Sequence, residues 1–268
     1  MKQELKNSFV NVNFLLGFGL MLICLFGMSI PEWVISVDWG DEFRQSALQQ
    51  SIIGIFFGGV MLLLPFCACV PYATHQVEEI RTSVMHWKLI RGSVRRYATE
   101  KIIATALSGG TVVAMAFVIH AMIWNFIAYP CDIIAHPYHE IGFSPTSVYA
   151  AWYSTFYGLP MYLSMAIGIF ICGAVWATVA LAISVWVPDK LLTITIPACL
   201  YYLLSASIFR QLFGWNLPHP ATLYNDALTW HDAALSLIEY CVILLIACVA
   251  YTVGLKSLQI KSQARNRT

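Results

Sequence analysis

The chain has 268 residues, of which 59% are hydrophobic and only 11% carry a charge. Soluble domains carry about 25% charged residues, so this chain has too little polar surface to cover a water-soluble body. Its formal net charge of +1 gives no basis for a nucleic-acid partner, and its mean hydropathy is +0.70. We therefore expect one transmembrane domain over residues 1–268, with the lipid bilayer as its surroundings.

Six segments are apolar over the roughly 20 residues that a spanning helix requires. They cover residues 13–30, 51–71, 102–128, 158–187, 191–209 and 235–255. Only Pro188, Asp189 and Lys190 separate the fourth segment from the fifth, which is typical of a tight turn. The pattern predicts an all-α, multi-pass integral membrane protein with six transmembrane helices.

The Lys and Arg residues predict the orientation of these helices, because they are concentrated in cytoplasmic loops. With the N-terminus inside, all of the 15 Lys and Arg residues except Arg44 and Arg210 lie on the inner side. The even number of spans then places the C-terminus inside as well. We expect an N-in, C-in protein of the cell membrane, of the bacterial cytoplasmic type.

The inner segment between the second and third spans predicts an amphipathic helix. Its apolar stripe consists of Val77, Ile80, Val84 and Trp87, and its charged flank of Glu78, Glu79, Arg81 and Lys88. Such a helix either docks a partner protein or lies flat on the membrane surface. On the outer side, residues 144–157 and 211–232 are rich in aromatic residues, which is typical of the membrane boundary.

A second candidate site comprises polar and strained positions within the predicted spans. His120 and Glu239 lie in the outer halves of their helices, where an ionisable side chain faces protein or water at lower cost than lipid. Pro197 removes a backbone hydrogen bond in the fifth span, and such breaks often line a cavity. The candidate pathway or polar pocket comprises His120, Asn125, Thr193, Pro197, Tyr201, Tyr202, Ser205 and Glu239. For Glu239, simple reach to the membrane surface remains the alternative.

Small residues within the spans predict helix packing. The sequence Leu-Ser-Gly-Gly-Thr at residues 107–111 is close to the signature of ABC ATPases, yet the chain has no phosphate-binding loop. Within a spanning helix, Gly109 and Gly110 allow close backbone approach, and Gly54 with Gly58 forms a second such face.

No pattern in the chain predicts catalysis or a cofactor. His136 and His139 lack a third ligand for a metal, and the eight cysteines follow no metal or disulfide spacing. No nucleophile motif is present either. We therefore expect no catalytic, cofactor-binding or metal-binding residues in this chain. The rival hypotheses are a membrane-embedded enzyme using His136, His139 or Glu239, and a non-transporting scaffold or immunity protein.

The stretch from Pro65 to Gly110 resembles the membrane subunits of type-2 ABC exporters. In those permeases the second helix leads into an acidic, amphipathic cytoplasmic helix, matched here by Glu78 and Glu79, and a basic segment precedes the third helix. The basic segment is matched by Arg91-Gly92-Ser93 and Arg95-Arg96-Tyr97, and Lys101 opens the third helix.

The resemblance implies a permease subunit that forms the export pathway with a second permease copy or a homologous permease. Separate ATPase subunits would bind ATP and Mg²⁺, dock on the amphipathic helix and drive transport. The sequence does not identify the transported substrate.

Overall fold

The computed structural model describes residues 2–38, 47–56, 60–91, 93–128, 159–205 and 230–265. Every regular element in these ranges is an α-helix, which confirms the all-α class for this part of the chain. The helices are α1 (Lys2–Phe9), α2 (Val12–Asp38), α3 (Ala47–Phe56), α4 (Val60–Cys69), α5 (Ala73–Arg81), α6 (Val84–Arg91), α7 (Val94–Ile127), α9 (Leu159–Trp186), α10 (Lys190–Ser205) and α12 (Trp230–Arg265). The aromatic segment 144–157, most of 211–232, His136 and His139 lie outside the described residues.

Four described helices are long and apolar enough to cross a membrane: α2, α7, α9 and the stretch Ala234–Ile260 of α12. Together they make the chain a multi-pass membrane protein. The fifth predicted span corresponds to α10, which has 16 described residues and is short for a full crossing. The second corresponds to α3 and α4, and residues 57–59 between them lie outside the described part of the chain.

Helix α12 extends beyond both ends of its predicted span, 235–255. Two further boundaries differ for a local reason. Helix α7 begins eight residues earlier than expected, because the Ser93 hydroxyl caps it by accepting a hydrogen bond from the Arg96 amide at 3.3 Å. Helix α2 continues through Pro31 to Asp38, so the proline costs one backbone hydrogen bond without ending the helix.

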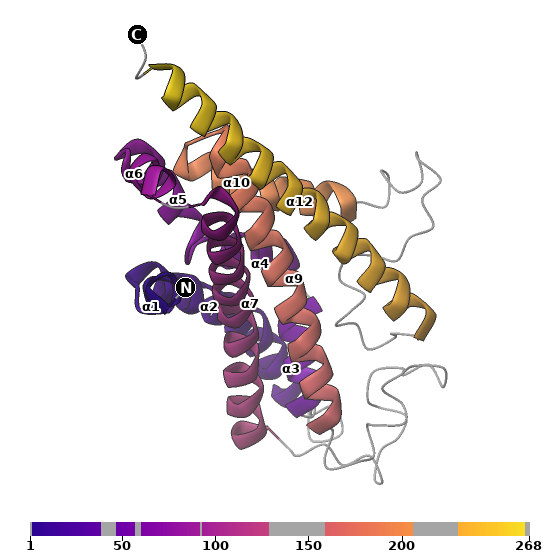
Figure 1. Cartoon of the computed structure of the whole chain (residues 1–268). Coiled ribbons are helices and arrows are strands. Elements are labelled where there is room, and N and C mark those ends of the chain that lie inside the picture. Colours follow the sequence, from indigo (N-terminus) through magenta and orange to yellow (C-terminus); the bar gives the residue numbers. More distant parts are fainter. Residues whose placement is uncertain are drawn as a thin grey trace.

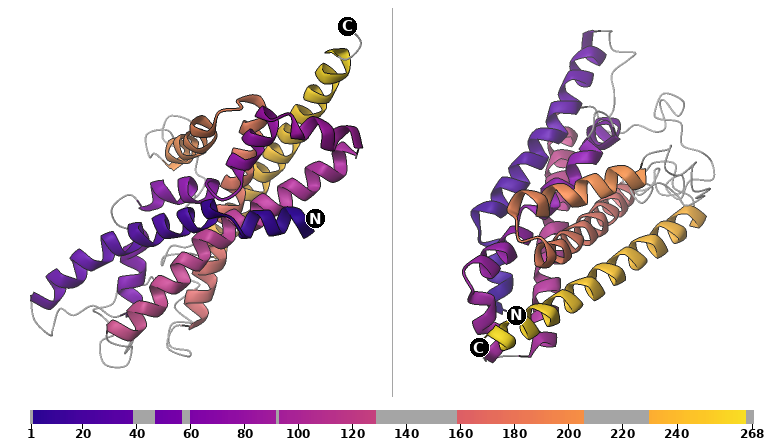
Figure 2. Two further views of the ribbon diagram at one scale, coloured as in Figure 1. Left: turned by 90° about the vertical axis from the view of Figure 1, so that its left-hand side faces the viewer. Right: turned by 90° about the horizontal axis from the view of Figure 1, so that it is seen from above.

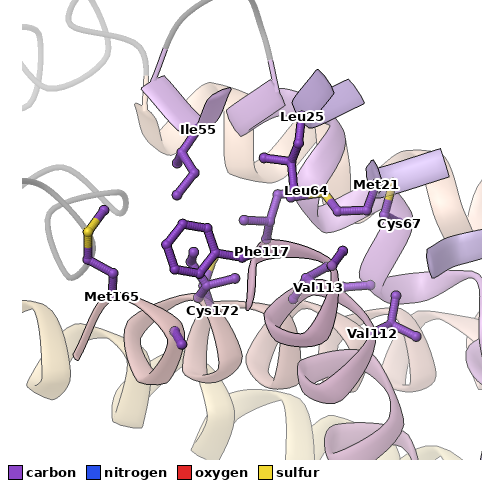
Figure 3. Close-up of a cluster of buried hydrophobic side chains, with 14 of the residues drawn as sticks. Met21, Leu25, Ile55, Leu64, Cys67, Val112, Val113, Phe117, Met165 and Cys172 are labelled. Atoms are coloured by element: carbon purple, nitrogen blue, oxygen red, sulfur yellow. The ribbon is translucent and has the colours of Figure 1, made fainter. Parts of the chain in front are cut away.

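Helices α7 and α9 form the centre of the bundle and run side by side (Figure 1). Their approach depends on glycines: a Cβ on Gly109 would lie 2.4 Å from the Cβ of Ala177, and one on Gly173 would lie 2.5 Å from Val113 Cγ2. The packing role predicted for the glycines of residues 107–111 is therefore confirmed. Buried side chains such as Phe117 and Cys172 extend this contact toward α2, α3 and α4 (Figure 3).

The remaining helices surround this central pair. Helices α2 and α12 lie on opposite sides of it (Figure 2). Only 22% of the apolar window of each is buried inside the protein. The N-terminus, α5, α6 and the C-terminal part of α12 gather at one end of the bundle (Figure 2). This end, which we call the junction end, also receives the turn between α9 and α10, and it contains the charged site described next.

Candidate functional site

A compact group of charged and phenolic side chains lies at the junction end. We call it the junction cluster and define it as Glu4, Tyr72, Glu79, Lys88 and Lys101. These residues come from α1, the α4–α5 link, α5, α6 and α7, so the cluster joins four helices. It contains two carboxylates and two ammonium groups and is therefore balanced in charge.

The cluster forms because the chain breaks between α5 and α6. Ser83 has a backbone φ of 60°, a left-handed conformation that ends α5 and redirects the chain. The Thr82 and Ser83 amides close the end of α5 by donating to the carbonyls of Glu78 and Ile80. Helix α6 then turns so that Lys88 meets Glu79 across the break. The single amphipathic helix predicted from the sequence is thus two shorter helices.

Lys101 is the centre of the junction cluster and is fully buried. Its ammonium group lies 2.9 Å from Glu79 Oε1, 2.9 Å from Glu4 Oε2 and 3.0 Å from Tyr72 Oη. Three oxygen acceptors match the three donors of a lysine ammonium group. The buried charge is therefore fully hydrogen-bonded.

The two carboxylates bring further helices into contact with Lys101. Lys88 Nζ lies 2.7 Å from Glu79 Oε1 and 2.9 Å from Glu4 Oε1, so α6 reaches α1 and α5 through one side chain. Tyr72 donates its hydroxyl hydrogen to Glu4 Oε2, and Tyr97 donates to Glu79 Oε2 at 2.6 Å. Each carboxylate thus accepts from both lysines and one tyrosine.

The charges and hydrogen bonds of the cluster favour the ionised forms of Glu4, Glu79 and Lys88. Burial opposes the charge on Glu4, yet the charge of Lys101 and the hydrogen bonds from Tyr72, Lys88 and Lys101 lower its pKa to about 2. Burial likewise opposes the charge on Glu79, but Lys101 and the hydrogen bonds from Lys88 and Tyr97 lower its pKa. Despite partial burial, the hydrogen bonds to Glu79 and Glu4 raise the pKa of Lys88.

A second set of contacts is solvent-exposed and holds the side of α5 that faces away from the junction cluster. Arg81 Nη2 lies 3.3 Å from Asp189 Oδ2, and Arg81 Nε donates to the Pro188 carbonyl at 3.1 Å. Lys190 pairs with Glu78. Helix α5 is therefore attached to α6 and α7 on one side and to the α9–α10 turn on the other.

These contacts change how the predicted coupling residues are placed. Val77 and Glu79 are buried, and Ile80 is half-buried. Val84 and Trp87, in contrast, are 42% and 63% exposed on α6. The predicted stripe is therefore not one continuous surface, because the break at Ser83 turns its first half inward. The sequence had suggested that Glu79 lies free on the surface. In the structure its carboxylate is instead bound inside the protein.

The second predicted site is divided between different parts of the bundle. His120 is fully buried between α2, α3 and α7, where Trp124 Nε1 donates to its Nε2 at 2.9 Å and Ser29 Oγ lies 2.9 Å from the same atom. A Cβ on Gly54 would lie 2.6 Å from His120 Cε1, which confirms the packing role of this glycine. Glu239 is half-buried on α12, which packs mainly on α9. The structure does not bring His120 and Glu239 together.

The remaining candidate residues fall into exposed and buried groups. Asn125 is exposed and its side-chain amide donates to the Ala121 carbonyl at 2.8 Å. On α10, Thr193, Pro197 and Tyr201 are buried, with Tyr201 edge-on to Trp176. Tyr202 is exposed beside an open apolar hollow lined by Ala198, Cys199 and Leu203. Ser205 ends α10.

Sequence reasoning did not identify the junction cluster, although its residues are visible in the sequence. Glu4, Tyr72 and Lys101 each lie at the edge of an apolar segment, and Lys101 served only for the orientation and for the resemblance at the start of the third helix. A signal was available: two acids and two lysines border membrane spans, where an unpaired charge is costly. Among the residues that the structure describes, no group of three or more His, Cys, Asp or Glu residues could hold a metal ion.

Comparison of the chain with protein-family models, with curated proteins and with solved structures yields no match. Arguments about function therefore depend on the residues and the geometry described above.

Proposed function

We propose that the chain is the membrane permease subunit of an ABC transporter, an exporter that pairs with a second permease copy and is powered by separate ATPase subunits. The observation that carries this proposal is α6. It is anchored at the junction end by buried Met85 and Leu89, while Val84 and Trp87 on the same short helix are exposed. Exposed apolar side chains on a firmly held helix are suited to docking in a groove of a partner.

The proposal includes six spans with both chain ends inside the cell. Support comes from the junction end, where α1, α5, α6, the α9–α10 turn and the C-terminal part of α12 meet. Together with the start of α7, these segments carry 12 of the 15 Lys and Arg residues. An impermeant thiol reagent applied to intact cells tests this topology. It should label Cys131, which lies outside the described residues, and a protease added outside should leave Lys261 uncut.

The structure alters how docking on a partner should be tested. Charge reversal at Glu79 would break the junction cluster, so loss of a partner in that variant would not identify a docking surface. Glu78 also has a bond, to Lys190. The exposed ring of Trp87 is the better target, because its removal leaves the buried contacts of α6 in place.

The proposed function is tested by purifying the chain from native membranes in mild detergent. We expect an ATP-hydrolysing subunit to co-purify with the wild type, and Trp87→Ala to lower its yield about tenfold or more, since a buried aromatic anchor contributes about 2 kcal/mol or more at an interface. Phe126→Ala is the matched control. Phe126 is also an exposed aromatic residue, at 86%, but it lies at the end of α7 that is far from the junction end. Absence of any ATPase from the wild-type preparation would contradict the proposal.

A further inference from the structure

The junction cluster connects the exposed helix α6 to the membrane-spanning helix α7 through an uninterrupted series of bonds. Lys88 of α6 contacts Glu79 of α5 at 2.7 Å, and Glu79 contacts Lys101 of α7 at 2.9 Å. Glu4 of α1 forms a parallel connection, with 2.9 Å to each lysine. A displacement of α6 therefore cannot leave α7 unaffected without separating buried opposite charges.

The cost of separating these charges makes the connection stiff. Lys101 is fully buried, and the side chains of Glu79 and Glu4 are only 5% and 12% exposed. Breaking a buried ion pair by removing one partner is strongly destabilising, because the remaining charge is left uncompensated. The exposed pair of Arg81 and Asp189 has no comparable cost, since water replaces each partner.

We propose that Lys88 and Glu4 are positioning residues that transmit movement of α6 to α7 through Glu79 and Lys101. This inference rests on the proposed function, in which α6 receives force from an ATPase. It adds to that function the route by which the force enters the membrane. Lys88 is the only described residue of α6 that contacts the cluster, so it is the first step of the route.

A variant that keeps the cluster balanced in charge should break the connection from α6 to α7 and preserve the fold. Glu4→Gln with Lys88→Met deletes one negative and one positive charge together. The buried pair of Glu79 and Lys101 stays intact at 2.9 Å, and Tyr97 still donates to Glu79. Met85 and Leu89 still anchor α6. Lys88→Met alone would leave an uncompensated carboxylate and confuse loss of transmission with loss of stability.

The experiment uses the complex with its co-purified ATPase and a fluorophore on α7. Met122 is 55% exposed near the far end of α7, so the label is attached at Met122→Cys in a chain whose native cysteines are replaced by serine or alanine. The probes are Mg²⁺ with ATP and Mg²⁺ with a non-hydrolysable ATP analogue. Arg96→Met is the matched control, because it also replaces a cation by methionine, on α7 outside the cluster.

We expect the label to respond to nucleotide in the wild type and in Arg96→Met. In the Glu4→Gln, Lys88→Met variant the response should fall about fivefold or more, the lower end of measured coupling between sites. Its ATPase yield and melting temperature should stay near those of the wild type. This combination distinguishes transmission from a merely structural role.

Three results would overturn the inference. An unchanged nucleotide response in the double variant would show that the cluster does not transmit movement, and the proposed function would stand. Absence of a response in the wild type, with ATPase bound, would show that α7 does not move. Loss of the ATPase from a folded double variant would assign Glu4 and Lys88 to docking instead. Failure of the wild type to retain any ATPase would instead refute the proposed function itself.

Discussion

Helix α7 carries two buried polar side chains, Lys101 and His120, and different kinds of partner surround each of them. At its junction end, Lys101 is held by two carboxylates and a phenol. Nineteen residues further on, about 28 Å along the axis, His120 is held by Ser29 and the indole of Trp124, with Phe26 against its ring. The first site combines opposite charges with a phenol, whereas the contacts described for the second include no carboxylate.

The partners of a polar group at these two sites depend on where in the bundle the group lies. The junction cluster lies where helices meet loops, so four helices can each contribute a charged side chain. His120 lies inside a predicted span, where aromatic rings and a hydroxyl from two helices surround it. A charge is tolerated at the first site because opposite charges surround it, whereas at the second site aromatic rings and a hydroxyl surround His120.

The largest effect is expected from Lys101→Met, which breaks the charge balance of the junction cluster. Glu4 and Glu79 would then share one lysine, and one buried negative charge would be uncompensated. We expect the free energy of unfolding to fall by about 3–5 kcal/mol, measured by thermal or denaturant unfolding in detergent. Adding Glu4→Gln to Lys101→Met should restore part of the loss, and no restoration would contradict charge balance as the cause.

A smaller effect is expected at the second site from Trp124→Phe. This change removes the indole N–H that His120 Nε2 and Ser29 Oγ share, at 2.9 and 3.1 Å, while keeping an aromatic ring. We expect a loss of about 1–3 kcal/mol, the cost of leaving a buried acceptor without its donor. Trp87→Phe is the control, since Trp87 is exposed. Equal stability of both variants would mean that the indole hydrogen bond is immaterial.

Acid separates the two sites, because only the junction cluster contains carboxylates. The pKa of Glu4 is about 2 in the folded protein, below the value of about 4.3 for a free glutamate. Its contribution to stability is therefore complete above about pH 4.3 and is lost as the pH falls through about 2. Melting temperatures measured from pH 6 to pH 2 should fall less steeply in Glu4→Gln than in the wild type. Parallel curves would contradict this role of Glu4.

The smallest effect is expected from Arg96→Met, five residues before Lys101 on the same helix. The Arg96 side chain is 80% exposed and lies 3.1 Å from Glu100 in an i, i+4 pair. Exposed pairs of this kind contribute about 0.3–0.5 kcal/mol. The melting temperature should therefore stay close to that of the wild type. A loss comparable to that of Lys101→Met would mean that burial does not explain the difference between these two cations.

Hydropathy predicted the long helices because the apolar runs of α2, α7, α9 and α12 exceed what a soluble core requires. The glycines of residues 107–111 and Gly54 also revealed their role, since a missing side chain in a span indicates a close neighbour. Ion pairs between residues far apart in the sequence could not be predicted. Nothing in the local sequence around Glu4 indicates that its partners are Lys88 and Lys101. The left-handed conformation of Ser83 could not be predicted either, because serine rarely adopts it. This conformation turns half of the predicted apolar stripe inward.

The pairing of Glu4 with Lys101 also bears on how the protein is made. Glu4 leaves the ribosome before Lys101, which follows about a hundred residues later, or roughly 5–20 s at common rates of synthesis. Until then, α1 lacks both of its lysine partners, and its polar sequence leaves it in water. The contacts of α1 in the junction cluster can therefore be completed only once the start of α7 has been made. A tag fused ahead of Lys2 would interfere with membrane assembly at this late closing step, after α2 has already been inserted.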